Sequence, residues 1–183
     1  MKKTVLTFGL LSGLVISGMM VALLPLQNRI HSVLLGYASM LAAFLLIWFG
    51  IRSYRDNVAG GSVRFGRAFA VGALIALVSS LCYTATWEVY YFGVGTDFVA
   101  KYQAHQMAEA REQGATQAEL DAKAAELKKF AEMYENPVIN AGMTLMEPLP
   151  LGLLVALISA GFLSRRRRSE GSEESEQAVT RTA

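Results

Sequence analysis

Long apolar runs separated by short polar segments dominate the chain. Four runs of about 20 to 26 residues carry no Lys or Arg and, apart from Glu88 and Glu147, no Asp or Glu; they lie at about residues 4–24, 32–51, 68–92 and 138–163. At about 1.5 Å per residue, each run is long enough to cross the roughly 30 Å hydrocarbon layer of a bilayer. The pattern predicts an all-α fold, an integral membrane four-helix bundle within residues 1–164.

Basic residues mark one end of every predicted span. Lys2 and Lys3 precede the first span, Arg52 follows the second, Arg67 precedes the third, and the run at 165–168 follows the fourth. If the chain crosses the membrane four times, these clusters all fall on one side, and Lys and Arg concentrate on the cytoplasmic side. We therefore expect both termini to lie in the cytoplasm.

A cleaved signal peptide is the alternative interpretation of the first run, because a positively charged start precedes an apolar stretch. At about 21 residues the run is longer than a usual signal-peptide core, and "VALLPLQN" offers no obvious cleavage site. Both features favour an uncleaved membrane anchor.

The only sizeable extramembrane segment separates the third and fourth spans and is rich in Ala, Glu, Gln and Lys. This composition predicts a helical hairpin over about residues 97–135, on the periplasmic side. We expect Gly114 to cap the first helix, while Thr116 and Glu119 have the spacing of a capping box that starts the second. Eight acids and five bases in this segment leave no basic face for nucleic acid.

The second hairpin helix carries a narrow apolar seam, at Leu120, Ala124, Leu127, Ala131 and Tyr134. One partner for the seam is the preceding helix, through Phe98 and Tyr102. The alternatives are a second copy of the chain or another envelope protein.

Catalytic and metal-binding signatures are missing from the sequence. Cys82 is the only cysteine, which leaves no internal disulfide and no cysteine-based metal site, and His31 and His105 stand alone. No nucleophile motif or phosphate-binding loop is present. We expect no enzyme activity, no cofactor and no metal. Residues 165–183 are expected to form a basic stop-transfer segment and a disordered cytoplasmic tail.

Two acids lie near the outer ends of the predicted spans, at Glu88 and Glu147. Glu147 precedes Pro148 and Pro150, whose missing N–H groups interrupt helical hydrogen bonding. A broken helix beside an acid is typical of binding or proton sites in transporters, so one hypothesis is a polar pocket of Glu88, Glu147 and Tyr83. The alternative is that Pro148 starts or kinks the helix and Glu147 pairs with Arg29 of the outer loop.

Small residues at four-residue spacing mark the predicted contact faces of the spans. They are Gly9 and Gly13 in the first span, Gly72 and Ala76 in the third, and Gly152 and Ala156 in the fourth. Small side chains let helix backbones approach closely, so these faces join spans or protomers.

Several stretches resemble the bacterial membrane family known as domain of unknown function 4199. They are "GGSVRFGRAFAVGALIALVSSLCYTATWEVYY" with the following "DF" and "KY", and "NPVINAGMTLMEPLPLGLLVALISA". The resemblance runs from the first span to Leu163. It implies a four-span protein of the bacterial inner membrane with an outer hairpin of variable length, and it implies no activity. Thr96 stands where the family pattern often has a proline.

The sequence therefore favours a non-enzymatic structural or accessory component of the inner membrane. Its expected contacts are the lipid bilayer and, through the seam at Leu120, Leu127 and Tyr134, a second copy or an envelope protein. The alternative function is a small transporter or proton-linked carrier that uses Glu88 and Glu147.

Overall fold

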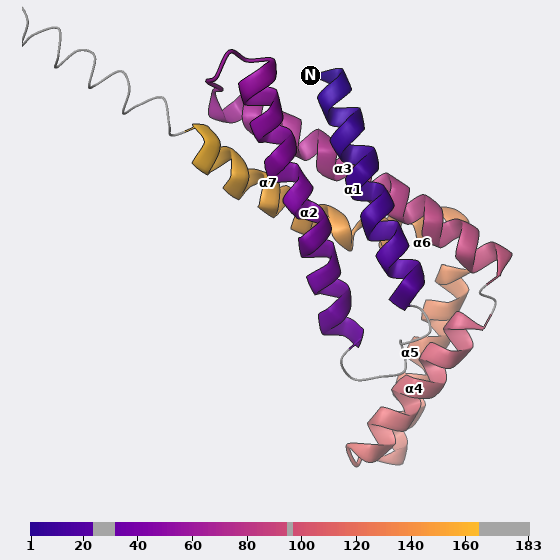
Figure 1. The fold of residues 1–183 in the computed structure, drawn as a ribbon. Coiled ribbons are helices and arrows are strands. Elements are labelled where there is room, and N and C mark those ends of the chain that lie inside the picture. The colour runs from indigo at the N-terminus through magenta and orange to yellow at the C-terminus, as the bar shows by residue number, and fades with distance from the viewer. Residues whose placement is uncertain (24–31, 95–96, 165–183) are drawn as a thin grey trace, which may run out of the picture.

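A computed structural model describes residues 1–23, 32–94 and 97–164. This described part is helical, with no strand in it (Figure 1). The helices are α1 (Lys2–Leu23), α2 (Ser32–Asn57), α3 (Phe65–Gly93), α4 (Phe98–Glu112), α5 (Gln117–Tyr134), α6 (Pro137–Leu145) and α7 (Pro148–Ser164). The predicted all-α class is confirmed.

Within the described residues, four helical segments are long and apolar enough to cross a membrane. They are Lys2–Leu23, Leu35–Asn57, Phe65–Gly93 and Pro137–Ser164, the last formed by α6 and α7 together. The helix α2 passes its predicted end at residue 51 and continues to Asn57. An apolar run identifies only the part of a helix that can lie in hydrocarbon. Polar residues that continue the same helix beyond that part are not detected by hydropathy.

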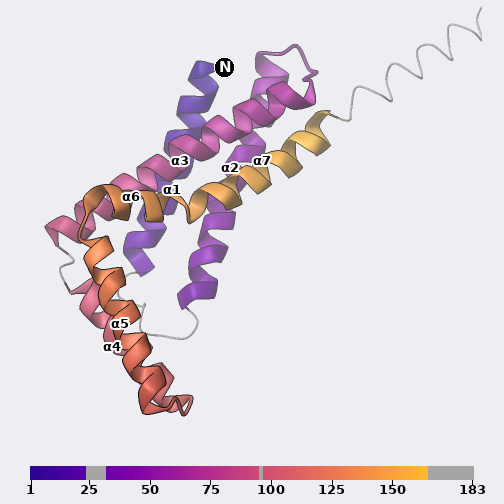
Figure 2. The same cartoon turned by 180° about the vertical axis from the view of Figure 1, so that it is seen from behind.

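The helix α3 lies at the centre and contacts α1, α2, α6 and α7. The helices α1 and α3 run in the same direction, since Gly9 lies against Val78 and Gly13 against Cys82. The N-terminus, the α2–α3 connection and the end of α7 lie toward one side of the molecule, and α4 and α5 lie toward the other (Figures 1 and 2). We call these sides the basic end and the hairpin end. The described basic residues of the basic end are Lys2, Lys3, Arg52, Arg55, Arg64 and Arg67.

The predicted small residues lie at helix contacts, and all six are buried: Gly9, Gly13, Gly72, Ala76, Gly152 and Ala156. A Cβ added to Gly13 would lie 2.6 Å from Cβ of Cys82, and one added to Gly152 would lie 2.9 Å from Cβ of Ala76. No side chain fits at either glycine without moving the neighbouring helix. In this structure the small-residue faces join spans of one chain.

Hydroxyl groups add hydrogen bonds between the packed spans. Ser12 Oγ donates to the carbonyl of Ala43 at 3.0 Å, and the hydroxyl of Ser79 is shared between the carbonyl of Ile75 in its own helix at 2.8 Å and that of Gly9 in α1 at 3.1 Å. Both serines are fully buried. Close helix approach brings each hydroxyl within reach of a backbone carbonyl of the neighbouring helix.

The hairpin is closed at its tip by the ends of its own helices. Gly114 adopts a φ of 81° after α4, and the N–H groups of Gly114 and Ala115 donate to the carbonyls of Arg111 and Ala110. This is a Schellman motif, which glycine permits because it has no Cβ. The helix α5 begins with the predicted capping box of Thr116 and Glu119. The N–H and hydroxyl of Thr116 lower the pKa of the Glu119 carboxyl.

The fourth membrane-length segment is not one continuous helix over 138–163, because α6 ends at Leu145 and α7 begins at Pro148. Pro148 and Pro150 both lie in the first turn of α7, where backbone N–H groups have no helical acceptor, so neither proline costs a bond within α7. The N–H of Glu147 approaches the carbonyl of Thr144 at 3.4 Å. The break therefore leaves Glu147 in a turn between two helices.

Candidate functional site

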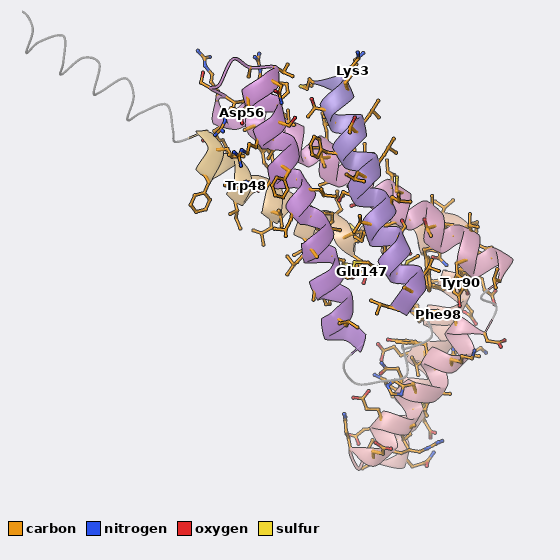
Figure 3. All side chains as sticks on the ribbon, viewed as in Figure 1. Lys3, Trp48, Asp56, Tyr90, Phe98 and Glu147 are labelled. Atoms are coloured by element: carbon orange, nitrogen blue, oxygen red, sulfur yellow. The ribbon has the colours of Figure 1, made fainter. Side chains whose placement is uncertain are left out.

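The polar residues of the fourth segment face α3 toward the hairpin end. Tyr83 is buried on α3, and its hydroxyl donates to Oε2 of Glu147 at 3.2 Å. Glu147 itself lies in the turn between α6 and α7, and Figure 3 labels it near the middle of the molecule. Two of the residues predicted to share a polar pocket are therefore in direct contact.

A second polar group, at Asn140, lies one to two helical turns before Glu147. Asn140 is fully buried and accepts the Trp87 Nε1–H through its Oδ1 at 3.0 Å. Its Nδ2 donates to the carbonyl of Tyr134 at 3.1 Å, and Thr144 Oγ1 donates to the same Oδ1 at 3.3 Å. One amide thus joins α3, α5 and α6.

Sequence reasoning missed the role of Asn140, although a signal was present. Asn140 and Thr144 are polar residues four apart in the apolar stretch "VINAGMTL", a spacing that puts them on one helix face. The Trp87 ring is buried at 5% exposure, and its N–H donates to Asn140.

Glu88 lies apart from the Tyr83–Glu147 pair. Five residues separate Tyr83 from Glu88 on α3, which places them about 140° apart around the helix. No hydrogen bond or ion pair joins Glu88 to Glu147 within the described ranges. The structure therefore supports only part of the predicted constellation of Glu88, Glu147 and Tyr83.

Three polar side chains of α3 follow one another at four-residue spacing and find no described partner. The atoms Ser80 Oγ, Thr84 Oγ1 and Glu88 Oε1 are buried without a hydrogen bond to any part of the chain that the structure describes. Buried polar groups in proteins are normally paired, and an unpaired one costs free energy. This polar row reaches Glu88 at the hairpin end of α3.

The predicted partner of Glu147, Arg29, lies outside the described residues, so the alternative Arg29–Glu147 pair is not described here. The residues of the predicted cytoplasmic tail, 165–183, lie outside them as well. Across the described ranges, no group of three or more His, Cys, Asp and Glu residues is placed to hold a metal ion.

An aromatic cluster joins the hairpin to the bundle and comprises Trp87, Tyr91, Phe98, Tyr102, Phe130 and Tyr134. The rings of Trp87 and Phe98 meet edge to face at 4.8 Å, and those of Tyr91 and Tyr134 do so at 5.3 Å. Such pairs are worth about 0.5–1.5 kcal/mol each beyond burial. Burial in this cluster raises the pKa of Tyr134. Figure 3 labels Phe98 where the hairpin meets the bundle.

The three large residues of the α5 seam are buried within the hairpin, whereas Ala124, which was predicted to belong to the seam, is exposed and Ala131 is half-buried. Leu120, Leu127 and Tyr134 are 7–9% exposed, and the Gln103 side chain of α4 donates to the Leu127 carbonyl at 2.9 Å. The rings of Tyr102 and Phe130 meet at 5.6 Å. The helix α4 thus covers the seam in this structure, and any other partner at the seam would have to displace it.

Together, the four apolar helical segments and the polar contacts near the hairpin end define the class as an all-α protein suited to a membrane. The family model described as "Protein of unknown function (DUF4199)" matches residues 7–165, most of the chain. The chain belongs to this family. No curated protein and no solved structure matches the chain.

Proposed function

We propose that the protein is a non-enzymatic accessory component of the bacterial inner membrane, with its hairpin held as a docking platform in the periplasm. The carrying observation is the aromatic cluster, which fixes α4 and α5 against α3 by ring contacts such as Trp87–Phe98. A segment that only connected two spans would not need such an anchor. The surface that this anchor orients is charged, because Glu109, Asp121 and Lys128 are all exposed.

The grouping of basic residues supports the orientation in this proposal. All described Lys and Arg residues of the bundle lie at the basic end, away from the hairpin. The excess of Lys and Arg in cytoplasmic segments would then place both termini in the cytoplasm. Reagents that do not cross membranes should modify a cysteine introduced at Ala108 in intact cells and should not modify one introduced at Ser62.

Site-specific photo-crosslinking tests the docking platform in living cells. A photoreactive residue at Ala108 or Ala125, both exposed on the hairpin, should give a discrete adduct with a second copy or with an envelope protein. The same residue at Ala42, exposed on the membrane-spanning α2, is the matched control and should give none. Phe98→Ala should reduce the hairpin adduct by loosening the aromatic cluster. Equal or absent adducts at the hairpin and control positions would count against a platform.

A second function, a small transporter or proton-linked carrier, is favoured by the polar row that ends at Glu88 and by the Tyr83–Glu147 hydrogen bond. One carboxylate oxygen of Glu88 is buried without a described partner, and ionisable residues in membrane-length helices often mark ion or proton pathways. The turn between α6 and α7 carries a second carboxylate, Glu147, at an interrupted helix of the kind found in transporters.

Reconstituted vesicles separate this second function from the first. A carrier predicts that Glu147→Gln and Glu88→Gln abolish proton or solute flux while the protein still folds. Glu109→Gln, on the exposed hairpin, should leave the flux unchanged. A parent protein without flux, or flux that survives both substitutions, removes the carrier function.

A further inference from the structure

A groove lies between α1 and α2 at the basic end, remote from the polar site. Its volume is about 410 Å³, and it is lined by Phe8, Leu46, Phe49, Arg52, Ser53 and Asp56. Phe8, Leu46 and Phe49 form the apolar part of the lining, and the other three residues are charged or carry a hydroxyl group. Figure 3 labels Asp56 toward the same end as Lys3. The groove is shallow and open, so a molecule bound in it would keep one side uncovered by the protein.

The charges in the groove leave Arg52 available to an anion. Asp56 Oδ1 lies 2.7 Å from Nε of the buried Arg55, whereas its Oδ2 is 3.6 Å from Nε of Arg52. Arg55 therefore neutralises Asp56 closely, and the Arg52 side chain is 58% exposed. A guanidinium group has five N–H donors, so most of those on Arg52 are not engaged by Asp56.

The surroundings of the groove add positive potential. Asp56 is the only acidic residue before Glu88 in the sequence, while six described basic residues lie at the basic end. An anion approaching the groove meets only the Asp56 carboxylate, which Arg55 already neutralises. The groove and its surroundings thus select negative charge.

We propose that this groove binds one anionic glycerophospholipid of the surrounding membrane leaflet. The lipid phosphate would contact the Arg52 guanidinium and the Ser53 hydroxyl, and an acyl chain would lie along Phe8, Leu46 and Phe49. Phe49 is 51% exposed, so it offers apolar surface that a chain can cover. Basic pockets between membrane helices are known to hold such headgroups. A free phosphate would satisfy Arg52 but leave the three apolar side chains uncovered.

The test uses the full-length protein in neutral detergent. Phosphatidylglycerol, phosphatidylcholine and inorganic phosphate are added separately, and bound lipid is counted by native mass spectrometry alongside the thermal midpoint. We expect phosphatidylglycerol to be retained at one per chain and to raise the midpoint more than the other two additives. Equal effects of phosphatidylcholine, or an equal effect of inorganic phosphate, would overturn the proposal.

Three variants locate the lipid. Arg52→Ala should weaken phosphatidylglycerol binding about tenfold, since a hydrogen bond to a charged group is lost. Phe49→Ala should weaken it several-fold while the charge is intact. Arg67→Ala is the matched control, because it removes the same charge from the same end outside the groove and should change binding less than about twofold. If Arg67→Ala costs as much as Arg52→Ala, binding is to diffuse surface charge and the groove is not a site.

Discussion

The contact of α3 with the fourth membrane-length segment differs between its two halves. Toward the basic end, α3 meets α7 through Gly72 and Ala156 and through Ala76 and Gly152, with no room for a larger side chain. Toward the hairpin end, the same helix meets α6 and the turn through Tyr83–Glu147 and Trp87–Asn140 hydrogen bonds. The interface is thus held by close packing of small residues next to α7 and by hydrogen bonds next to α6.

This difference shows what each half can tolerate. Helices that associate in lipid gain little from apolar burial, so close packing of small residues holds the half near α7. A broken helix needs partners for its freed carbonyls, and at the end of α6 the N–H groups of Met146 and Glu147 lie 3.1 Å and 3.4 Å from the carbonyls of Gly142 and Thr144. In the same half, Asn140 satisfies the Tyr134 carbonyl at the end of α5. The polar half can carry a helix break, whereas the packed half cannot.

The largest expected effect comes from the packed half. Gly152→Leu should destabilise the protein by about 3 kcal/mol, because even its Cβ would meet Ala76 at 2.9 Å. Gly161→Leu on the same helix is the matched control, because an added Cβ there has no heavy atom within 4 Å. Unfolding of both variants in a denaturing-detergent titration measures the difference. Equal stability of the two would contradict packing as the source of cohesion.

A smaller effect is expected in the polar half. Asn140→Leu should cost about 2 kcal/mol, because the Trp87 N–H and the Tyr134 carbonyl lose a buried partner. The same titration measures it, and Trp87→Phe completes a double-mutant cycle. The double variant should lose less stability than the sum of the two single losses, because both single variants remove the same hydrogen bond. Strict additivity would show that the bond contributes nothing.

The smallest effect belongs to the Tyr83–Glu147 bond. Tyr83→Phe should lower stability by about 0.6 kcal/mol, a typical value for a hydrogen bond between membrane helices. Tyr90→Phe is the control, because no hydrogen bond of the Tyr90 hydroxyl is present in the described structure. A loss above about 2 kcal/mol for Tyr83 alone would indicate a larger network around Glu147.

Much of the fold was predictable from the sequence because apolar length and small-residue spacing are local signals. The four spans and the capping box at Thr116 follow from patterns within a few turns. The break before Pro148 was also expected, because the proline pair marks it in the sequence, and α7 does begin at Pro148. The end of α2 was less accessible, because it depends on how polar residues continue a helix, which hydropathy does not measure.

The candidate site was predictable only in part. The acid beside the proline pair pointed to Glu147, and Tyr83 is its hydrogen-bond donor. The separation of Glu88 from that pair depends on helix rotation and on the turn at 146–147. The Trp87–Asn140 bond joins residues 53 positions apart, and pairing at that distance needs the tertiary packing of α6 on α3.

The lengths of α4 and α5 set how far the closed tip of the hairpin extends from the helical bundle. Because the Schellman motif at Gly114 and the capping box at Thr116 satisfy the two helix ends with nearby residues, the tip does not depend on the bundle. Equal numbers of turns added to α4 and α5 would lift the same tip farther into the surrounding compartment. The length of the hairpin can therefore change without any change in the packing of the four membrane-length segments.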